Sequence, residues 1–385
     1  MRVLYLLDYP LGLTGGAQIY SLSMGELLRK AKKAEIFYCY PSNSKYISNI
    51  SKSFVLEINS LKNHFIAPYK NPFEFCRIVN KIQSFIYHIQ PHIIHSQMPI
   101  SLIINALMKA DYPVVKCHTD RSLYEYYRLP MRIINHWALK KIDMLFTTTN
   151  INAHNWQNKT NTRVKVIPNL VSNEFNSYNP EFKINLQKKH KIKDSLVIGF
   201  AGRMTEAKNW PLALEIVKKL DQNRKNFFVF LILGVNYDNY LEKKKAEELV
   251  ATMKSILGNR LVYKENATQK EMSNFYYLVD IFLLTSKMES FGRTAIEAMA
   301  RKCCVLGTNV GGIPEVIGDP DLICDQNSQC FIDRLIPLMD NRELLEEKKE
   351  RLFMRYKKTF DPEVIISNQY TIYQELLNEK KQRGD

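Results

Sequence analysis

The sequence predicts an α/β fold of two doubly wound domains that face each other across a cleft. Two observations support this prediction. Short, nearly continuous apolar runs alternate with segments of helical periodicity, and this alternation occurs twice along the 385 residues. Uninterrupted apolar runs indicate parallel strands that are buried on both faces. Each half therefore consists of repeated βα units, which form a doubly wound sheet.

The first half opens with the apolar run RVLYLL at 2–7, a glycine-containing loop at 8–18 and a helical pattern at 19–30. Further strands are expected at 35–40, 92–96 and 113–117, and weaker ones at 143–149 and 164–168. Helical patterns at 73–89 and 130–142 lie between them. We assign residues 1–170 to a first Rossmann-like domain.

The second half repeats this order after a polar, asparagine-rich stretch at 166–195, which we interpret as a boundary and linker because it lacks a long periodic segment. A strand and a glycine-containing loop follow at 196–209, with a helix from about Trp210. Strands are expected at 227–234, 260–265, 281–286 and 303–308. Residues 171–361 form the second Rossmann-like domain, and the helix in 362–385 is expected to pack across the two domains.

The composition fits a globular protein with an anionic partner. Apolar residues make up 45% and charged residues 24%, as in ordinary soluble domains. Lys and Arg number 54 against 39 Asp and Glu, a net charge of +15, which favours nucleic acid, a phosphorylated ligand or an acidic membrane. The seven cysteines form no CxxC pair, so neither a zinc site nor a disulfide framework is indicated. No apolar run is long enough for a signal peptide or a membrane span, so we expect a cytoplasmic protein.

Three segments of the second half follow predicted strands and so fall at the edge where doubly wound sheets bind ligands. The first, GFAGRMTEAKN, places Gly202, Arg203 and Lys208 in a loop. Glycine allows close backbone approach, and the two cations supply the charge that a diphosphate needs. Taken alone, Arg and Lys in a loop are as well explained by a solvated surface.

The second segment, KMESFGRTAIEAMA, turns from a strand into a helix. Its N–H groups at Phe291, Gly292 and Arg293 are expected to bind a phosphate. Glu289 would lie near the group beyond the phosphates, and Glu297 would accept hydrogen bonds from two ribose hydroxyls, since a carboxylate only accepts. Taken singly, each glutamate is better explained as a solvated residue near a helix start.

The third segment, TNVGGIPEVI, is a loop that contains Gly311, Gly312 and Pro314 and follows another strand. Glycines at such a position also simply build a turn. Together the three segments indicate one ligand, a nucleoside diphosphate that carries a group within reach of Glu289.

These motifs resemble the retaining GT-B glycosyltransferases of family 4, also called group 1. The resemblance rests on GR…K at 202–208, on the E-x7-E motif at 289–297 and on NVGGIPEVI at 309–317. It extends to TGGAQ at 14–18, VIPN at 166–169 and PVVKCHTD at 113–120, in the order of the family. The chain departs from the family in VIPNLVS, where VIPNGVD is usual, in Cys304, where Pro is usual, and in Arg293, where an aliphatic residue is common.

The resemblance implies an N-terminal acceptor-binding domain and a C-terminal domain that binds a nucleotide sugar. It implies that Arg203 and Lys208 bind the donor diphosphate, that Glu297 holds the ribose and that Glu289 lies at the donor sugar. His118 matches the histidine that approaches the sugar and the reaction centre; the other explanation is a structural hydrogen bond at a strand end. The predicted catalytic residues are therefore His118 and Glu289, and the predicted donor-binding residues are Gly15, Gly16, Arg203, Lys208, Phe291, Gly292, Arg293 and Glu297.

The implied reaction is hexosyl transfer with retention of configuration, without a metal or other cofactor. The donor would be a UDP- or GDP-sugar, with UDP preferred, and no DxD-like pair presents a metal clamp. The acceptor would be a glycan or a lipid-linked molecule in cell-surface polysaccharide or glycoconjugate synthesis.

Basic and apolar residues also occur together in two groups of the first half: Lys45, Tyr46, Lys52, Phe65, Lys70 and Phe73, and Arg128, Met131, Arg132 and Trp137. They fit peripheral contact with an anionic membrane, on the inner face of the cell membrane, about as well as a generally basic surface. The alternatives to a transferase are a GT-B-fold sugar-nucleotide epimerase and, with much less support, a basic nucleic-acid-binding protein, since no nucleic-acid module is recognisable.

Overall fold

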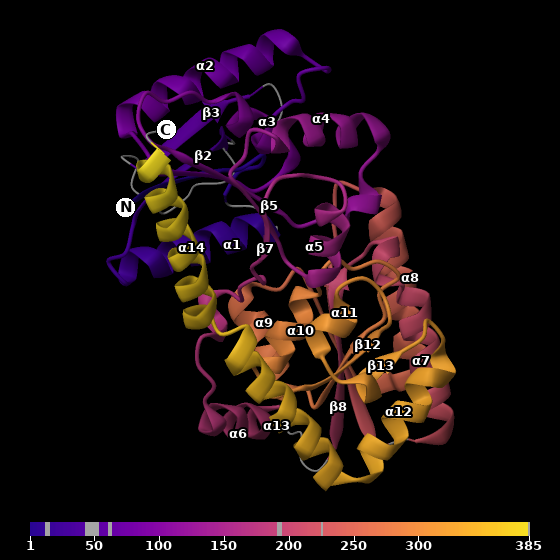
Figure 1. The fold of residues 1–385 in the computed structure, drawn as a ribbon. Coiled ribbons are helices and arrows are strands. Elements are labelled where there is room, and N and C mark those ends of the chain that lie inside the picture. The colour runs from indigo at the N-terminus through magenta and orange to yellow at the C-terminus, as the bar shows by residue number, and fades with distance from the viewer. Residues whose placement is uncertain (12–15, 43–53, 61–63, 191–194, 225, 384–385) are drawn as a thin grey trace. The chain divides into compact units, whose positions relative to one another are not determined.

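The computed structural model describes residues 1–11, 16–42, 54–60, 64–190, 195–224 and 226–383. Gly15, Lys45, Tyr46 and Lys52 from the sequence predictions lie outside the described residues. The chain divides into two compact units, whose elements are labelled in Figure 1. Unit 1 comprises residues 1–170 together with 362–385, and unit 2 comprises residues 171–361.

Unit 1 contains a parallel sheet whose described strands have the order β3-β2-β1-β4-β5-β6-β7. The strands are β1 (Arg2–Leu6), β2 (Glu35–Ser42), β3 (Val55–Asn59), β4 (Ile93–Ser96), β5 (Val115–Asp120), β6 (Met144–Thr147) and β7 (Val164–Val166). The helices are α1 (Gly16–Lys30), α2 (Pro72–Ile89), α3 (Pro99–Leu107), α4 (Leu129–Leu139), α5 (Asn150–Gln157) and α14 (Pro362–Arg383).

The sheet of unit 1 is covered on both faces, which explains its continuous apolar strands. Successive side chains of β1 alternate between two buried clusters. Val3 and Tyr5 pack in the cluster that includes side chains of α1 and α14. Leu4 and Leu6 pack in the cluster that includes side chains of α2 and α3. Because neither face contacts water, no position of β1 is required to be polar.

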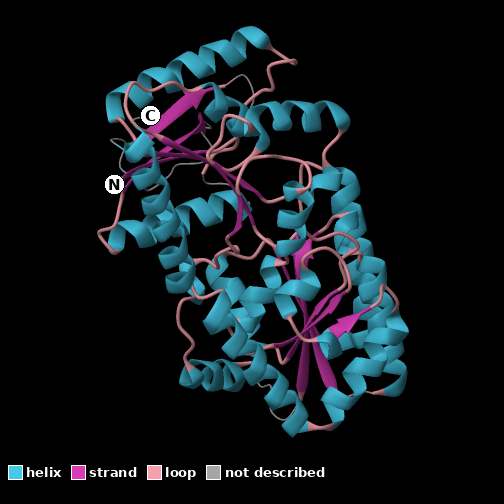
Figure 2. Ribbon diagram, in the orientation of Figure 1, coloured by secondary structure: helices cyan, strands magenta, loops and turns pink. Residues whose placement is uncertain are grey.

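Unit 2 has a second parallel sheet, with the described strands in the order β10-β9-β8-β11-β12-β13. Its strands are β8 (Leu196–Arg203), β9 (Phe227–Gly234), β10 (Leu261–Glu265), β11 (Ile281–Leu284), β12 (Cys304–Thr308) and β13 (Ile323–Cys324). Its helices are α6 (Pro180–Lys189), α7 (Trp210–Asn223), α8 (Tyr240–Leu257), α9 (Gln269–Leu278), α10 (Arg293–Met299), α11 (Ile313–Ile317), α12 (Ser328–Asp340) and α13 (Arg342–Thr359). Figure 2 shows strands and surrounding helices in both units, and the predicted pair of doubly wound α/β domains is confirmed.

Each sheet has one point at which the strand order reverses. In unit 1 this point lies between β1 and β4, and in unit 2 it lies between β8 and β11. The chain leaves the carboxyl ends of these neighbouring strands in opposite directions, which opens a crevice where ligands bind. We therefore expect ligands at the loops that follow β1, β4, β8 and β11.

The structure corrects the interpretation of 166–195 as a linker. Its described part contains the short 3-10 helix η3 (Asn173–Phe175) and the helix α6. Phe175 and Leu186 are buried in the core of unit 2. Only Leu186 of α6 is buried, and the helix is otherwise polar, so it lacks the apolar periodicity that the sequence analysis required.

The last helix, α14, packs in unit 1. It contributes Ile365, Ile366, Tyr373, Leu376 and Leu377 to the cluster on the α1 face of the sheet. Tyr373 OH and His95 Nδ1 lie 2.5 Å apart, and Lys380 Nζ lies 3.0 Å from Asp143 Oδ1. The segment after 361 thus completes the core of the unit that contains the N-terminus.

Candidate functional site

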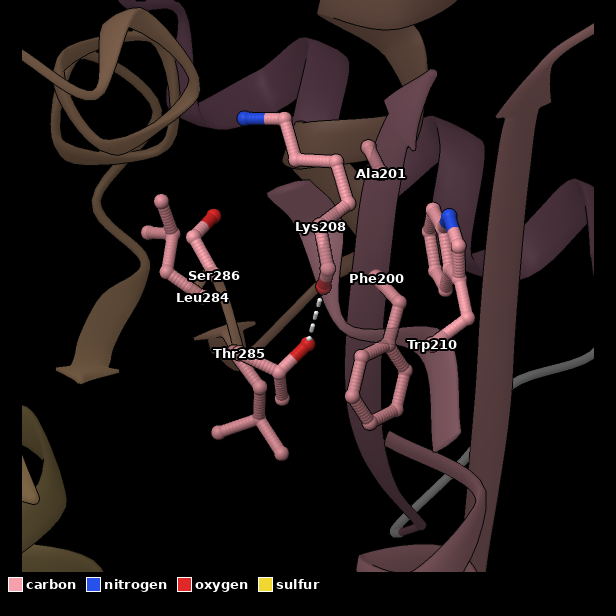
Figure 3. A pocket seen from close by; sticks show the side chains of 8 residues that line it. Phe200, Ala201, Lys208, Trp210, Leu284, Thr285 and Ser286 are labelled. Carbon is pink, nitrogen blue, oxygen red and sulfur yellow. Dashed lines mark hydrogen bonds between the residues drawn. The ribbon is translucent and has the colours of Figure 1, made fainter. Parts of the chain in front are cut away.

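The predicted residues of unit 2 gather where its strand order reverses. Gly202 and Arg203 are the last residues of β8, not part of the following loop as the sequence analysis expected. Lys208 ends the 3-10 helix η4 (Glu206–Lys208). Thr285 and Ser286 directly follow the neighbouring strand β11, and they line the same small pocket as Lys208 (Figure 3).

Hydrogen bonds join the loop after β8 to the loop after β11. Thr285 Oγ1 donates to the backbone oxygen of Lys208 over 3.0 Å, the contact drawn as a dashed line in Figure 3. The backbone N–H of Lys287 donates to the oxygen of Ala207 over 2.8 Å. These bonds fix the backbone of Lys208, while its side chain extends away from Thr285 (Figure 3).

Lys208 and Glu289, which come from two of the three predicted segments, form an ion pair. Lys208 Nζ lies 2.5 Å from Glu289 Oε2, and the two side chains are 20% and 17% exposed. The third segment joins them, because the N–H of Gly312 donates to the backbone oxygen of Glu289 over 3.1 Å. The three segments thus meet, and the pair is partly open to solvent.

Glu297 is a buried carboxylate with one oxygen that lacks a hydrogen-bond donor. The side chain is 2% exposed, and Oε2 accepts a hydrogen bond from Tyr276 OH over 3.3 Å. Arg293 Nε lies 3.1 Å from Oε1, but the contact lacks hydrogen-bond geometry, and Oε1 has no donor among the described residues. Burial raises the pKa of Glu297 above its usual value, and the charge of Arg293 opposes this rise.

The remaining predicted residues of unit 2 are Phe291, Gly292 and Arg203, and they differ in burial and conformation. Phe291 is buried, and its ring packs edge-on against Phe360, so its side chain is not presented to a ligand. Gly292 caps α10 with φ at 91°, a left-handed conformation that favours glycine. Arg203 is exposed, and its side chain forms no ion pair in the described part of the chain.

His118 lies within β5 of unit 1 and is buried. Its Nδ1 is 3.1 Å from the backbone oxygen of Ser96 and 3.0 Å from Ser96 Oγ. Because a carbonyl oxygen only accepts, Nδ1 carries the proton and Nε2 presents a lone pair. Burial lowers the pKa of His118 to about 3, so the ring is neutral at physiological pH.

Gly16 is the first residue of α1 and is exposed. A methyl group added at Gly16 would meet no atom of the described residues within 4 Å. Its predicted neighbour Gly15 falls outside the described residues.

Sequence reasoning missed the two residues that hold the site together, Tyr276 and Thr285. Tyr276 is fully buried in α9 and hydrogen-bonds Glu297, and an isolated tyrosine in a helix carries no signal of that contact. Thr285 was visible only as the polar residue that ends the apolar run IFLL. In the part of the chain that the structure describes, no group of three or more His, Cys, Asp or Glu side chains is arranged to hold a metal ion.

Residues 182–353, all within unit 2, match the model of the family Glycosyl transferases group 1. One relative is the N-acetyl-alpha-D-glucosaminyl L-malate synthase of Bacillus anthracis, 36% identical over 116 residues, 29% of this chain and 30% of the relative. Another is the lipopolysaccharide 1,2-N-acetylglucosaminetransferase of Salmonella typhimurium, 25% identical over 50% of this chain and 52% of the relative. The matches to these two curated relatives thus span about half of their length or less.

Solved structures resemble nearly the whole chain at low identity. The sucrose-phosphate synthase of Thermosynechococcus elongatus superposes with a TM-score of 0.82 at 16% identity, over 98% of this chain and 100% of that one. HepE of Anabaena, in complex with UDP, superposes with a TM-score of 0.77 at 15% identity, over 97% and 100%. Together the solved structures show a GT-B fold, and the match to the glycosyl transferases group 1 family lies within unit 2.

Proposed function

We propose that the chain is a retaining hexosyltransferase of family 4. It transfers a sugar from a nucleoside-diphosphate sugar, UDP in preference to GDP, to a glycan or lipid-linked acceptor in cell-surface polysaccharide or glycoconjugate synthesis. The observation that carries this proposal is that two features occur together at the strand-order reversal of unit 2. One is the buried carboxylate of Glu297, whose Oε1 has no hydrogen-bond donor among the described residues, and the other is the partly exposed ion pair of Lys208 and Glu289.

Glu297 is the proposed ribose ligand. Its Oε1 is buried and has no hydrogen-bond donor among the described residues, which is costly unless a ligand supplies one. Two adjacent ribose hydroxyls are both donors, and a carboxylate accepts from both. Tyr276 and Arg293 hold the carboxylate before the ligand arrives, so little ordering is left for the binding step.

Lys208 and Arg203 are the proposed cations for the diphosphate, and no metal is needed in this proposal. Lys208 exchanges Glu289 for a phosphate oxygen when the donor binds. Because the Lys208 ammonium gains a phosphate oxygen as it releases the Glu289 carboxylate, its charge stays paired through the exchange. The seven-residue α10 has a weak dipole at best, so the charge on the leaving diphosphate is balanced mainly by these two side chains.

The released Glu289 then faces the donor sugar. In the proposed front-side transfer the leaving phosphate oxygen takes the proton of the acceptor hydroxyl, so the chain supplies positioning and leaving-group stabilisation, not a base. Neutral His118 fits this scheme as a hydrogen-bond acceptor for a sugar hydroxyl, through Nε2. It is too weak a base to hold a proton in this environment.

The preference for UDP rests on similarity. HepE, whose structure has UDP bound, shares the fold, and several relatives are named as N-acetylglucosaminyltransferases. We therefore propose UDP-N-acetylglucosamine and UDP-glucose as the first donors to assay.

Glu289→Gln separates transfer from donor binding. The variant is expected to lose at least about tenfold in kcat, while UDP binds as tightly as in the wild type or more tightly, because Lys208 no longer has a competing carboxylate. UDP release and calorimetry on the same preparations measure the two effects. Equal loss of transfer and of UDP affinity would overturn the proposed role of Glu289.

The epimerase and the nucleic-acid-binding alternatives each predict a result that a glycosyltransferase would not give. An epimerase converts the donor without any acceptor, so a changed sugar nucleotide after incubation with donor alone would identify one. A nucleic-acid-binding protein would keep DNA bound at moderate salt. We expect neither result.

The membrane contact is proposed through one face of α4. Leu129, Ile133 and Trp137 recur every four residues and are 69%, 62% and 41% exposed, so they share a face. Lys141 Nζ lies 4.5 Å from the Trp137 ring centre, and the helix is flanked by exposed cations. Arg132, in contrast, donates to the backbone oxygens of Tyr127 and Glu125, so it is held to the protein.

This face is tested by vesicle co-sedimentation. Wild type is expected to bind phosphatidylglycerol vesicles more than phosphatidylcholine vesicles. Ile133→Ser with Trp137→Ser is expected to abolish the binding. The control is Tyr240→Ser, an aromatic position on α8 of unit 2 that is more exposed, at 74%, than either Ile133 or Trp137. Equal binding by all three proteins would overturn the proposal.

Among the helices of the described residues, none combines the length and the apolar character that crossing a membrane requires.

A further inference from the structure

Unit 1 contains a guanidinium group that lacks an anionic partner. Arg121 directly follows β5, and Gln97 directly follows the adjacent strand β4, at the reversal of strand order. Arg121 Nη2 donates to Gln97 Oε1 over 2.8 Å, and Nη1 donates to Asn169 Oδ1. Both acceptors are neutral amides. No carboxylate of the described residues forms an ion pair with Arg121.

The nearest carboxylate in the sequence, Asp120, is engaged elsewhere. Its oxygens accept hydrogen bonds from Tyr127 OH over 2.6 Å and from Trp156 Nε1 over 2.5 Å. The N–H of Ser122 also donates to it over 3.0 Å. Asp120 is thus held by Ser122, Tyr127 and Trp156 and forms no ion pair with Arg121 in the described part of the chain.

Two buried donors around Arg121 lack acceptors among the described residues. The first is Nε of Arg121, which is buried and has no hydrogen-bond partner in the described part of the chain. Gln97 is 1% exposed, and its amide orientation is fixed, because its oxygen must face the guanidinium, which only donates. The nitrogen Nε2 of Gln97 is therefore the other end of the amide, and it too is buried without an acceptor.

The charge of Arg121 persists in this environment. Its guanidinium stacks on the ring of Tyr20, 4.0 Å from the ring centre, which stabilises a cation without neutralising it. Burial lowers the pKa of Arg121 to about 10, so the group is charged at neutral pH. A partly buried cation that has a buried donor without an acceptor, and no anion among the described residues, is unfavourable until an anion binds.

We propose that Arg121 and Gln97 bind an anionic group, a carboxylate or a phosphate, that belongs to the acceptor substrate. This inference rests on the proposed transferase function. The donor diphosphate already has Lys208 and Arg203 of unit 2, whereas Arg121 lies in unit 1 beside the strand of His118. A planar guanidinium offers two parallel donors to two oxygens of one anionic group. The acceptor is thus an acid or a phosphate ester, not a neutral glycan.

The test follows the Nε–H signal of Arg121 by NMR during a titration with inorganic phosphate and, separately, with succinate. The signal is assigned from its absence in Arg121→Lys. At least one anion is expected to shift it in a saturable manner, because Nε–H acquires an acceptor. If chloride at equal ionic strength produces the same shift, or if neither anion shifts the signal, the proposal is overturned.

Gln97→Glu is the decisive variant, since it places a carboxylate beside Arg121. It is expected to raise the thermal unfolding midpoint and to weaken anion binding at Arg121 at least about tenfold. The control Lys208→Ala, which alters the proposed diphosphate site, is expected to leave the titration of Arg121 unchanged. Gln97→Glu with unchanged anion binding would overturn the proposal.

Titration with UDP separates this inference from the proposed function. If UDP itself shifts the Arg121 signal to saturation, the residue serves the donor, and the assignment to the acceptor is wrong. If UDP binds nowhere while phosphate shifts Arg121, the proposed function fails and the anion site stands. The expected result is that UDP binds without saturating Arg121 and that phosphate or succinate still shifts the signal afterwards.

Discussion

Glu289 and Glu297 occur in one motif but have different surroundings. Glu297 is buried and held by Tyr276 and Arg293, so its orientation exists before any ligand binds. Glu289 is partly exposed and paired with Lys208, so its partner can be exchanged. A fixed carboxylate suits recognition of the nucleoside, and an exchangeable one suits a group that meets the sugar only after the diphosphate has bound.

Gly292 and Gly16, two of the predicted donor-binding glycines, are expected to differ in how much an alanine substitution costs. Gly292→Ala is expected to lower the free energy of unfolding by about 1–2 kcal/mol, because φ is 91° there. No atom lies closer than 3.7 Å to the added methyl group, so the cost is conformational. Gly16→Ala, without positive φ or close neighbours, is expected to change stability by less than about 1 kcal/mol. Urea denaturation of both variants measures this, and equal losses would contradict it.

Asp8 predicts a pH-dependent contribution to stability. Its carboxylate accepts from the N–H groups of Ile100 and Ser101 over 2.8 and 2.6 Å, yet burial raises its pKa from 3.8 to about 6. The folded state therefore binds a proton more tightly than the unfolded state. The stabilisation is fully present below pH 3.8 and is lost as the pH rises through 6.

Asp8→Asn removes this titration. As the pH rises from 4 to 7, the free energy of unfolding of the variant is expected to gain about 2–2.5 kcal/mol relative to that of the wild type, at 1.36 kcal/mol per pKa unit. Urea denaturation at several pH values gives this difference. A difference that stays constant with pH would mean that the Asp8 carboxyl has the same pKa in both states.

Among the elements, α13 is attached to the sheet of unit 2 by a buried ion pair. Lys349 Nζ lies 2.7 Å from Asp280 Oδ1, and both side chains are almost fully buried. Asp280 Oδ2 also accepts from the N–H of Val197, at the start of β8. Helix α13 thus depends on a contact that the sequence shows only as one lysine among many.

Lys349→Met is expected to lower the free energy of unfolding by about 3–5 kcal/mol, because it leaves the Asp280 carboxylate buried without its cation. Lys357→Met on the same helix breaks an exposed pair with Asp361 and is expected to cost less than about 1 kcal/mol. Chemical denaturation compares the two variants. Similar costs would show that Asp280 finds other partners.

Elements with two buried faces or a strong apolar stripe were predictable, and those without were not. Strands β1 and β9 were predictable because positions 3–7 and 227–233 are all apolar. Strand β3 was missed, since only Ile58 of its five residues is buried. Helix α6 was missed for the same reason. The site motifs were visible because they fall at strand ends, whereas Tyr276 and Arg121 act through contacts that no local pattern encodes.

The C-terminal segment 362–385 belongs to unit 1, the same unit as residues 1–170. Removing residues 362–385 would expose the buried face of α14 and leave Tyr20 without Gln369 and His95 without Tyr373. A chain ending at Asp361 is therefore expected to lose the cooperative unfolding of unit 1, while unit 2, whose core lies within 171–361, stays folded. Hydrogen exchange resolved by segment would show this. Equal protection of unit 1 with and without α14 would contradict it.

Binding of UDP tests the account most directly. Calorimetric titration of UDP and GDP into the wild type and into Glu297→Gln compares the nucleotide and the carboxylate in one experiment. We expect UDP to bind the wild type more tightly than GDP, and the variant to bind UDP at least about tenfold more weakly, because one charge-assisted hydrogen bond is lost. If neither nucleotide binds the wild type, or if the variant binds UDP as tightly as the wild type does, the donor site proposed around Glu297 and Lys208 is wrong.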